Sequence, residues 1–529
     1  MKKRIWGTLS PFFPDVTKKE AIVGMNIANA SFSRAMLRYS TFDELHFFVY
    51  SGIQADRVHN IYQEDIQNFK GEVKFFRREE LPEQMASVDY TAFHLSDHLQ
   101  NFSSLAYLRN RYGHFPITAF IHSLSYQDSM KHYLTLSMDG LGQSDAFLCS
   151  STPGAEVIAH LMSHAAASLG KEPSSSQRIV VPLGVEDIAG FYSVKTARKK
   201  LSIPSNAVVG LYFGRFSDYD KMDLFPLLQA FQWVLKKTPD AFLVLAGNVQ
   251  SEEYFEILRL WSQMLQIHER VLFLRSPGET LKRVLYNTSD FFISISDNPQ
   301  ETFGLSLVEA MSASLPLLVS DYNGYKEVAS DAVSIKVPTI WGKFPYMQEL
   351  SPFLDASSLH RHLAQSLALD NRVLREGLLH LFSSAPLRAK LGRAGRERFL
   401  SLYHSPVVIQ KLESIWDRLK SNYVPVPSTT DPLAMPYFET FQHYPTEFLS
   451  QNMRLQHSDF FREWQKKGVE YPILTNLNWA IKRENIDWLS ARLGNAHLVG
   501  DLEQIWPKET WALHYTLLWM LKHDLLEKV

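Results

Sequence analysis

Short apolar runs alternate with longer amphipathic stretches along most of this chain. Short runs rich in Val, Ile, Phe and Leu are typical of buried β-strands, and the stretches between them have the periodicity of helices. In the first half the predicted strands are residues 45–50, 73–76, 92–95, 117–121, 146–149 and 178–181, and residues 22–39 are predicted to form a helix.

A second series of the same kind follows. Its predicted strands are residues 208–213, 241–246, 271–274 and 290–296 and a run at Leu317, with helices at 225–236 and after Gly304. Strands that alternate with helices form parallel sheets covered on both faces, and such sheets bind ligands beyond the carboxyl ends of their strands. We therefore predict an α/β protein with two facing, Rossmann-like, doubly wound domains.

The rest of the chain has a different pattern. Residues 405–419 predict an amphipathic helix, and four prolines between 425 and 436 predict an extended linker. Residues 437–529 are predicted to be a helical extension, in which Trp511, Tyr515 and Leu518 share one helical face. We expect this extension to pack against the body of the protein or a partner subunit, with acceptor recognition as the alternative. The predicted segments are 1–190, 191–402, 403–420, 421–436 and 437–529.

Composition limits the class of protein. The chain has 529 residues, of which 45% are hydrophobic and 21% charged, an ordinary globular composition that is long enough for two or three domains. A formal net charge of −2 gives no sign of a nucleic-acid partner. The one cysteine, Cys149, excludes an internal disulfide and lies in an apolar run, as expected of a packed residue in a reducing compartment.

The sequence predicts a soluble, cytoplasmic protein. No apolar run approaches the ~20 residues that span a bilayer. Pro11 and Pro14 interrupt the basic start of the chain, which argues against a signal peptide. A peripheral contact with a membrane remains open.

One stretch combines a strand, a polar turn and the start of a helix. Strand 290–296 leads into a loop that ends in Glu301-Thr-Phe-Gly304, where a helix begins. The first N–H groups of a helix lack internal partners and carry the positive end of its dipole, so this geometry binds anions. Glu301 and Glu309, with seven residues between them, can accept hydrogen bonds from sugar or ribose hydroxyls on both sides of a bound phosphate.

This stretch resembles the E-x7-E signature of retaining GT-B glycosyltransferases, glycosyltransferase family four in particular. Residues 315–328 fit the family's next strand and glycine turn, and residues 182–186 resemble the turn that ends its first domain. The resemblance covers about residues 1–420 and implies that Glu309 binds the ribose and Glu301 the transferred sugar. It also implies a diphosphate site at the helix N-terminus, formed by Thr302, Phe303, Gly304 and Leu305.

A second motif presents Arg215 and Lys221 on one loop after a strand. Transfer from a nucleotide-sugar needs cations at the departing diphosphate, where negative charge grows in the transition state. Arginine can bind phosphate bidentately, and lysine adds a point charge. The loop resembles the family's GR…KG-x-D element, but it is about one residue longer and Met222 replaces the glycine.

No metal or other cofactor is predicted. The sequence has no HExxH motif and no Cys/His cluster with ligand spacing. Asp218 and Asp220 have the spacing of an Asp-x-Asp motif, but they lie inside the basic loop and are interpreted as solvated. The helix N-terminus with Arg215 and Lys221 would take the place of a divalent ion.

His122 follows strand 117–121 and is expected to point into the cleft between the domains. It resembles the family's histidine near the donor sugar, and His94 and Asp97 follow a similar strand as weaker candidates. By the same resemblance, Gly247, Asn248 and Ser276 lie at the edge that holds the nucleotide base. The family's N-terminal glycine pair has no match here, and Gly7 and Gly24 are both candidates for its place.

These observations predict a retaining glycosyltransferase with the GT-B fold. Its partners would be a nucleotide-sugar donor, UDP- or GDP-linked, and a glycan, lipid-linked, protein or small-molecule acceptor. Catalysis would rest on His122, Arg215, Lys221 and Glu301 by front-side attack, with the leaving phosphate taking the acceptor's proton. The alternatives are a sugar-nucleotide epimerase, a phosphorylase-like enzyme, or a non-catalytic subunit that assembles with a partner or oligomerises through its C-terminal extension.

Overall fold

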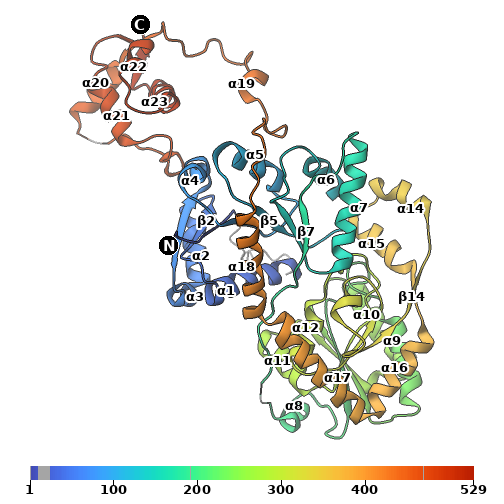
Figure 1. Ribbon diagram of the computed structural model, residues 1–529. Coiled ribbons are helices and arrows are strands. Elements are labelled where there is room, and N and C mark those ends of the chain that lie inside the picture. The colour runs from blue at the N-terminus through green and yellow to red at the C-terminus, as the bar shows by residue number, and fades with distance from the viewer. Residues whose placement is uncertain (1, 10–23, 191, 469) are drawn as a thin grey trace. The chain divides into compact units, whose positions relative to one another are not determined.

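The computed structural model describes residues 2–9, 24–190, 192–468 and 470–529. The chain separates into two compact units, Met1–Leu433 and Ala434–Val529. The first unit contains two sheets, with strand orders β3-β2-β1-β4-β5-β6-β7 and β10-β9-β8-β11-β12-β13, in which all neighbouring strands are parallel (Figure 1). We call the part built on the first sheet, together with α18, the first lobe, and the part built on the second sheet the second lobe.

The elements of the first lobe follow the alternation seen in the sequence. Its strands are β1 (Ile5–Thr8), β2 (Glu44–Val49), β3 (Glu72–Arg77), β4 (Ala92–Leu95), β5 (Ile117–Phe120), β6 (Ala146–Cys149) and β7 (Gln177–Val180). Its helices are α1 (Gly24–Tyr39), α2 (Gly52–Ile61), α3 (Gln63–Asn68), α4 (Leu81–Ser87), α5 (Phe102–Tyr112), α6 (Met130–Leu136), α7 (Thr152–Ser168) and α18 (Ser405–Ser421), with the short turn η2 (Gln127–Ser129) before α6.

The second lobe repeats the plan. Its strands are β8 (Val208–Phe213), β9 (Ala241–Gly247), β10 (Val271–Arg275), β11 (Phe291–Ser294), β12 (Leu317–Ser320) and β13 (Ser334–Val337), with a small pair β14 (Thr339–Trp341) and β15 (Leu367–Leu369). Its helices are α8 (Val194–Lys200), α9 (Phe225–Leu235), α10 (Glu252–Met264), α11 (Glu279–Thr288), α12 (Leu305–Ser312), α13 (Tyr325–Val328), α14 (Pro345–Leu350), α15 (Ala356–Gln365), α16 (Asn371–Ser383) and α17 (Ala385–Arg398), with the short turn η4 (Ser351–Phe353).

Strand order identifies the edge where a ligand would lie. In the first sheet β1 lies between β2 and β4, and in the second β8 lies between β9 and β11, so each order reverses beside its first strand. Open parallel sheets bind ligands at the carboxyl ends of the strands that flank such a reversal. In the second lobe those strands are β8 and β11, whose following loops carry the predicted Arg215, Lys221 and Glu301.

The structure confirms the α/β class and the two doubly wound sheets, and it adds strands that the sequence analysis missed. Strands β1 and β13 are short, and β1 contains a glycine. A Cβ on Gly7 would lie 2.6 Å from the Phe93 ring, so this glycine permits close packing inside a strand. Gly7 is therefore not a substitute for the family's N-terminal glycine pair. The other candidate, Gly24, starts α1, and residues 10–23 lie outside the described residues.

Helix α18 follows the second lobe in the chain but packs into the first. Its side chains Val408, Leu412 and Trp416 are buried in the same core as Phe47 and Phe120, and it lies against α1 (Figure 1). Inside this core the Trp416 indole N–H donates a hydrogen bond of 2.9 Å to Thr118 Oγ1 on β5. The chain thus crosses between the lobes twice, and the second crossing ends in a buried core.

Residues 434–529 form a separate unit with its own core. The helices are α19 (Tyr437–Thr440), α20 (Asp459–Lys466), α21 (Arg483–Ser490), α22 (Val499–Ile505) and α23 (Thr510–Lys522). An antiparallel sheet joins β16 (Arg454–His457), β17 (His497–Leu498) and β18 (Leu526–Lys528), which the sequence analysis missed. Helix α23 buries Leu513, Leu517 and Met520 in this core. Its predicted packing face, Trp511, Tyr515 and Leu518, is instead 41–50% exposed.

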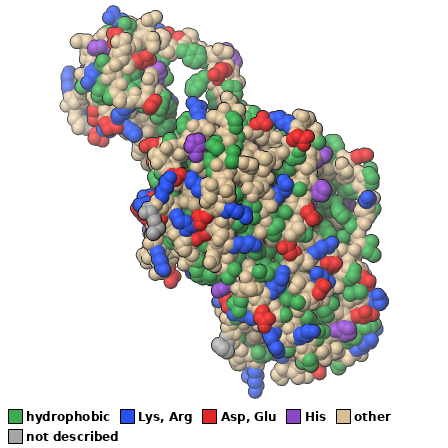
Figure 2. Space-filling model, viewed as in Figure 1, with side chains coloured by type: hydrophobic (Ala, Val, Ile, Leu, Met, Phe, Trp, Pro, Cys, Tyr) green, Lys and Arg blue, Asp and Glu red, His purple; other side chains and the backbone are tan. Residues whose placement is uncertain are grey.

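Charged side chains of both signs are interspersed over the face of the molecule shown in Figure 2. This distribution agrees with the formal net charge of −2 and offers no single basic stripe on that face for a nucleic-acid backbone. Within the described ranges, no helix combines the length and the apolar character that crossing a bilayer requires.

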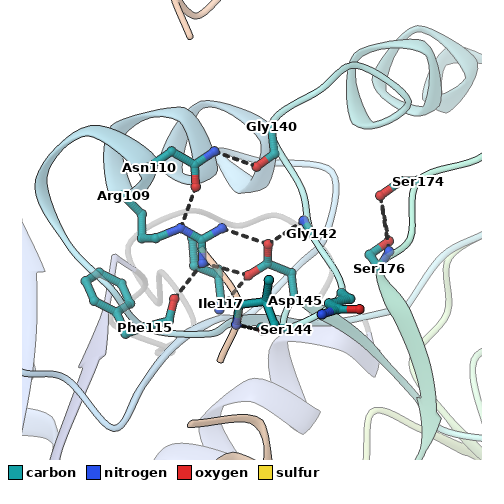
Figure 3. Close-up of polar contacts among 12 residues, drawn as sticks. Arg109, Asn110, Phe115, Ile117, Gly140, Gly142, Ser144, Asp145, Ser174 and Ser176 are labelled. Atoms are coloured by element: carbon teal, nitrogen blue, oxygen red, sulfur yellow. Dashed lines mark hydrogen bonds and ion pairs between the residues drawn. The ribbon is translucent and has the colours of Figure 1, made fainter. Parts of the chain in front are cut away.

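A buried ion pair joins α5 to the start of β6 in the first lobe. Arg109 donates from Nη1 and Nη2 to the two carboxylate oxygens of Asp145, at 2.9 and 2.7 Å, and both side chains are almost completely buried (Figure 3). The remaining groups are satisfied as well. Arg109 also donates to the Phe115 carbonyl, and Asp145 accepts from the backbone N–H groups of Gly142 and Ile117. Removing one partner would therefore leave a buried charge without compensation.

We predict that Asp145→Ala lowers the free energy of unfolding by about 3–5 kcal/mol, the usual cost of breaking a buried pair on one side. Asp139→Ala is the matched control, because Asp139 is 75% exposed and pairs with the half-exposed Lys171 at 2.8 Å. That change should cost less than about 1 kcal/mol. Urea unfolding of both variants measures the difference, and equal losses would contradict the structural role given to Arg109 and Asp145.

Candidate active site

The loops after β8 and β11 bring a predicted cation and a predicted carboxylate into contact. The two strands are neighbours in the sheet, with Phe291 beside Gly210. Lys221 Nζ donates a hydrogen bond of 2.7 Å to Glu301 Oε2, and both side chains are largely buried. Burial by itself would raise the pKa of Glu301, but the charge and hydrogen bond of Lys221 outweigh it, so the pKa lies below its ordinary value. Glu301 is therefore held as a carboxylate.

Arg215 lies on the same loop and is held by its own neighbours. Its Nη1 donates to Asp220 Oδ2 at 2.7 Å and to Gln250 Oε1 at 3.1 Å. The interpretation of Asp218 and Asp220 as solvated is wrong. Asp220 is 7% exposed, and Asp218 accepts a hydrogen bond of 2.7 Å from Arg361 Nε on α15. Each aspartate neutralises an arginine, which explains two acidic residues inside a basic loop.

The turn before α12 has the conformation that its glycines require. Gly304 precedes the helix with φ 97°, in the left-handed region that favours glycine. A Cβ on Gly324, from the turn after β12, would lie 2.0 Å from the Thr302 carbonyl oxygen. The two turns therefore pack directly on each other. Phe303 is buried beneath them, and α12 starts at Leu305 with its first N–H groups at the carboxyl edge of the sheet.

Met222 occupies the position where the family has a glycine. Its side chain is 1% exposed and lies in the core of the second lobe beside Tyr254 and Leu224. The buried Met222 side chain therefore anchors the loop in the core, while the neighbouring Lys221 reaches Glu301.

Glu309 lies one turn inside α12, and it has partners that the sequence analysis missed. Lys282 on α11 donates to Glu309 Oε1 at 2.5 Å, and the Tyr286 hydroxyl donates to Oε2 at 3.2 Å. The pKa of Lys282 is raised because the attraction of Glu309 outweighs the effect of burial. The amphipathic pattern of residues 279–288 is the signal that could have placed a lysine and a tyrosine on one face of a helix.

The proposed nucleotide-base edge is assembled from the ends of β9 and β10. The Ser276 N–H donates to the Gly247 carbonyl at 2.8 Å, and the Asn248 carbonyl accepts from Phe216 N at 2.8 Å. A Cβ on Gly247 would lie 1.8 Å from the Gly214 carbonyl oxygen, so the strand end meets the Arg215 loop backbone to backbone. Gly247, Asn248 and Ser276 are thus grouped beside that loop.

His122 follows β5 in the first lobe and lies opposite the Glu301 loop. Its carbonyl oxygen accepts a hydrogen bond of 3.2 Å from Thr302 Oγ1. Its Nε2 lies 2.9 Å from the Ser96 carbonyl and 3.2 Å from Asn29 Oδ1, both within the first lobe. Burial lowers the pKa of His122, so the ring is neutral near pH 7. The structure brings the backbone of His122 to the site, while Nε2 is engaged within its own lobe.

The two weaker candidates have structural surroundings. His94 is fully buried between Phe32, Phe120 and Trp416, and its Nδ1 lies 2.9 Å from Thr118 Oγ1. Asp97 accepts a hydrogen bond of 2.7 Å from Leu99 N, and burial raises its pKa. His94 is therefore a core residue, and Asp97 shapes the loop after β4.

Asp297 is a buried carboxyl group that the sequence analysis did not single out. It lies just after β11 and is 5% exposed. Its Oδ2 accepts a hydrogen bond of 2.9 Å from the Asp223 N–H, at the end of the Arg215 loop. Among the described residues no partner contacts its Oδ1. Burial raises the pKa of Asp297 to about 7. The side chain thus links the loops after β8 and β11, and its pKa lies near neutrality.

This raised pKa predicts a pH-dependent stability. The folded state favours protonated Asp297, so the contribution is complete below the unfolded-state pKa and is lost as pH rises through about 7. Between pH 6 and 8 the wild type should lose about 1 kcal/mol through this group. Asp297→Asn, which keeps an acceptor for the Asp223 N–H, should remove that loss in thermal unfolding scans across this pH range. Asp139→Asn, at an exposed aspartate, should keep the wild-type slope; equal slopes in all three proteins would contradict the assignment.

Within the described part of the chain, no three His, Cys, Asp or Glu side chains are grouped to hold a metal ion. Three cations at this edge of the sheet, Arg215, Lys221 and Lys282, are each paired with a carboxylate. The arrangement offers charge of both signs on adjacent loops, which suits a ligand with an anionic and a hydroxyl-rich part.

Comparison with known sequences agrees with this geometry. Residues 193–341, which span α8 to β14, match the family described as Glycosyl transferases group 1. The chain is 31% identical over 199 residues to an alpha-monoglucosyldiacylglycerol synthase of Streptococcus pneumoniae. It is 31% identical over 123 residues to a GDP-mannose:cellobiosyl-diphosphopolyprenol alpha-mannosyltransferase of Xanthomonas oryzae, and 27% identical over 206 residues to a phosphatidyl-myo-inositol mannosyltransferase of Mycobacterium tuberculosis.

These matches are partial. They cover 36%, 23% and 39% of this chain, and the chain spans 40%, 31% and 48% of the three relatives.

Solved structures confirm the GT-B fold. A sucrose-phosphate synthase from Thermosynechococcus elongatus superposes with a TM-score of 0.53 at 16% identity, over 79% of this chain and 100% of that one. A glycosyltransferase from Rickettsia africae gives 0.54 at 13%, over 80% and 100%. The Anabaena protein HepE in complex with UDP gives 0.52 at 13%, over 78% and 99%. At these identities the likeness concerns the fold.

Proposed function

We propose that this chain, whose residues 193–341 belong to the glycosyl transferases group 1 family, transfers a sugar from a nucleotide-sugar to a hydroxyl acceptor with retention of anomeric configuration. The observation that carries the proposal is the Lys221–Glu301 pair of 2.7 Å at the strand-order reversal of the second sheet. In this pair a lysine that would bind the diphosphate lies beside a carboxylate that would bind the sugar, and Arg215 lies on the same loop as the lysine.

The donor would lie along the carboxyl edge of the second sheet. Its diphosphate would bind the first N–H groups of α12, together with Arg215 and Lys221, and the ribose hydroxyls would donate to Glu309. The base would lie beside Gly247, Asn248 and Ser276. Glu301 would accept hydrogen bonds from hydroxyls of the transferred sugar and so orient its anomeric carbon.

In the reaction, the bond between the anomeric carbon and the phosphate oxygen breaks while a bond to the acceptor oxygen forms on the same face. The acceptor's proton goes to the departing phosphate oxygen. Arg215, Lys221 and the α12 N-terminus stabilise the charge that grows on the leaving diphosphate, without a metal ion. Closure of the two lobes around the donor would exclude water and so limit its hydrolysis.

The acceptor is proposed to carry a lipid. The three relatives named above are called after a glycolipid, a polyprenol-linked sugar and a phosphatidylinositol. A soluble glycan, protein or small-molecule acceptor would be the alternative outcome of an acceptor screen.

The proposal is tested first by nucleotide binding. UDP and GDP are each added to the full chain, and the one that matches the donor should raise the melting temperature, since a ligand that binds only the folded state stabilises it. The corresponding nucleotide-sugar should then release free nucleotide slowly, and NMR of a transfer product should show the donor's anomeric configuration. A chain that responds to no nucleotide or nucleotide-sugar would instead be a non-catalytic subunit, and release of an epimer would indicate an epimerase.

We predict that Glu309→Ala weakens nucleotide binding about tenfold or more, because hydrogen bonds to a charged group contribute about 1.5–3 kcal/mol. Titration calorimetry with the nucleotide that shifts the wild type provides the measurement. Glu279→Ala is the matched control, because Glu279 also pairs with Lys282, at 3.6 Å, but is 63% exposed. It should bind within about twofold of the wild type, whereas equal losses in both variants would move the ribose site away from Glu309.

A further inference from the structure

The side chain of Gln300, immediately before Glu301 in the second lobe, reaches the first lobe. Its Nε2 donates a hydrogen bond of 2.6 Å to Ser123 Oγ, and its Oε1 accepts one of 2.8 Å from Ser125 Oγ. Both serines follow β5, one and three residues after His122. The amide thus uses its donor and its acceptor on two hydroxyls of a single loop, which fixes its orientation.

The Ser125 hydroxyl extends this link to helix α15. His360 Nε2 lies 3.0 Å from Ser125 Oγ and 3.2 Å from the Ser125 carbonyl oxygen. A carbonyl only accepts, so Nε2 carries the proton and donates to both atoms, while the serine donates its own proton to Gln300. His360 is 1% exposed, and its ring lies 4.7 Å from that of Tyr126. The Ser125 hydroxyl is therefore held between Gln300 and the buried ring of His360.

The residue after Glu301 is tied to the first lobe as well. Thr302 Oγ1 donates to the His122 carbonyl at 3.2 Å, and the Thr302 carbonyl accepts from Ser151 Oγ at 2.7 Å. Glu301 thus lies between two residues that each contact the loop containing His122. In the proposed reaction the sugar would be held from one lobe by Glu301 and approached from the other by the His122 loop. Their relative position is determined by these links.

We propose that Gln300 is a positioning residue that, through its hydrogen bonds to Ser123 and Ser125, aligns the Glu301 carboxylate with the His122 loop across the two lobes. This inference deepens the proposed function and rests on it. In the proposed reaction Gln300 would touch neither the nucleotide nor the reacting atoms, because its side-chain amide is engaged by Ser123 and Ser125. Its loss should therefore lower turnover while leaving nucleotide affinity unchanged, because a misplacement of about 1 Å can cost about 100-fold in rate.

The test is Gln300→Leu, which keeps a side chain of similar length and removes both hydrogen bonds. The donor is whichever of UDP-glucose, UDP-N-acetylglucosamine and GDP-mannose releases nucleotide with the wild-type chain, with water as the acceptor. We expect kcat to fall about 10- to 100-fold. The KM for the donor and the Kd for the free nucleotide should change less than about threefold, and the melting temperature should stay within a few degrees of the wild type.

Gln127→Leu is the matched control. Gln127 accepts a hydrogen bond of 2.9 Å from Ser351 Oγ, which also joins the two lobes but lies apart from Glu301 in the sequence and contacts neither of its neighbours. The same change of side chain there should leave kcat within about twofold of the wild type. Equal losses of kcat in both variants would show that lobe contact in general matters, and would overturn the specific role of Gln300.

A double variant of the two serines provides a second measurement that does not depend on the folding of Gln300→Leu. Ser123→Ala with Ser125→Ala should lower kcat to a similar degree, and in a folded Gln300→Leu background the serine changes should add little, because they remove the same interaction. Wild-type kcat in the serine double variant overturns the proposal while leaving the proposed function intact. A wild-type chain that binds no nucleotide and turns over no donor overturns the proposed function itself.

Discussion

The pairing of Lys221 with Glu301 is the interaction on which the second lobe's site depends. The two residues are eighty positions apart in the chain, but β8 and β11 are adjacent parallel strands, so their following loops meet at one edge. A carboxylate at this buried position would be costly without a cation, and Lys221 supplies it. A ligand with an anionic part and hydroxyl groups could replace either side chain of this pair as the partner of the other. In the proposed function, diphosphate would replace Glu301 beside Lys221, and sugar hydroxyls would replace Lys221 beside Glu301.

Two further cations of this edge follow the same rule. Arg215 is paired with Asp220, and Lys282 with Glu309. Each pair holds its side chain in place before a ligand arrives, so binding exchanges partners and need not order free side chains. Preorganisation of this kind reduces the entropic cost of binding. It also gives the buried Asp220 of the basic loop a role, because this aspartate holds Arg215 in place.

The first lobe is connected to the second lobe's site by the chain segment that ends in α18 and by the hydrogen bonds around Glu301. Helix α18 buries Trp416 in the first lobe's core, which anchors the end of the chain segment that leaves the second lobe. Next to Glu301, hydrogen bonds of Gln300 and Thr302 connect the Glu301 loop to the loop after β5. A packed helix and a group of hydrogen bonds thus act at different places, and only the hydrogen bonds lie next to the site. Such hydrogen bonds can break and re-form at modest cost, as the proposed binding of a donor would require.

Much of this architecture could be predicted from the sequence because strands and helices leave periodic patterns, and because glycines such as Gly304 and Gly324 mark turns with specific sterics. β1 was missed because it is four residues long and contains Gly7. Asp218 and Asp220 were misinterpreted, since their partners Arg361 and Arg215 are selected by tertiary packing. Lys282 and Gln300 were missed for the same reason: Glu309 and Ser125 lie 27 and 175 residues from them, and no local pattern records such a pairing. Residues that bind through their own backbone or helix terminus are therefore visible in a sequence, whereas residues that act by holding another side chain become visible only in the folded chain.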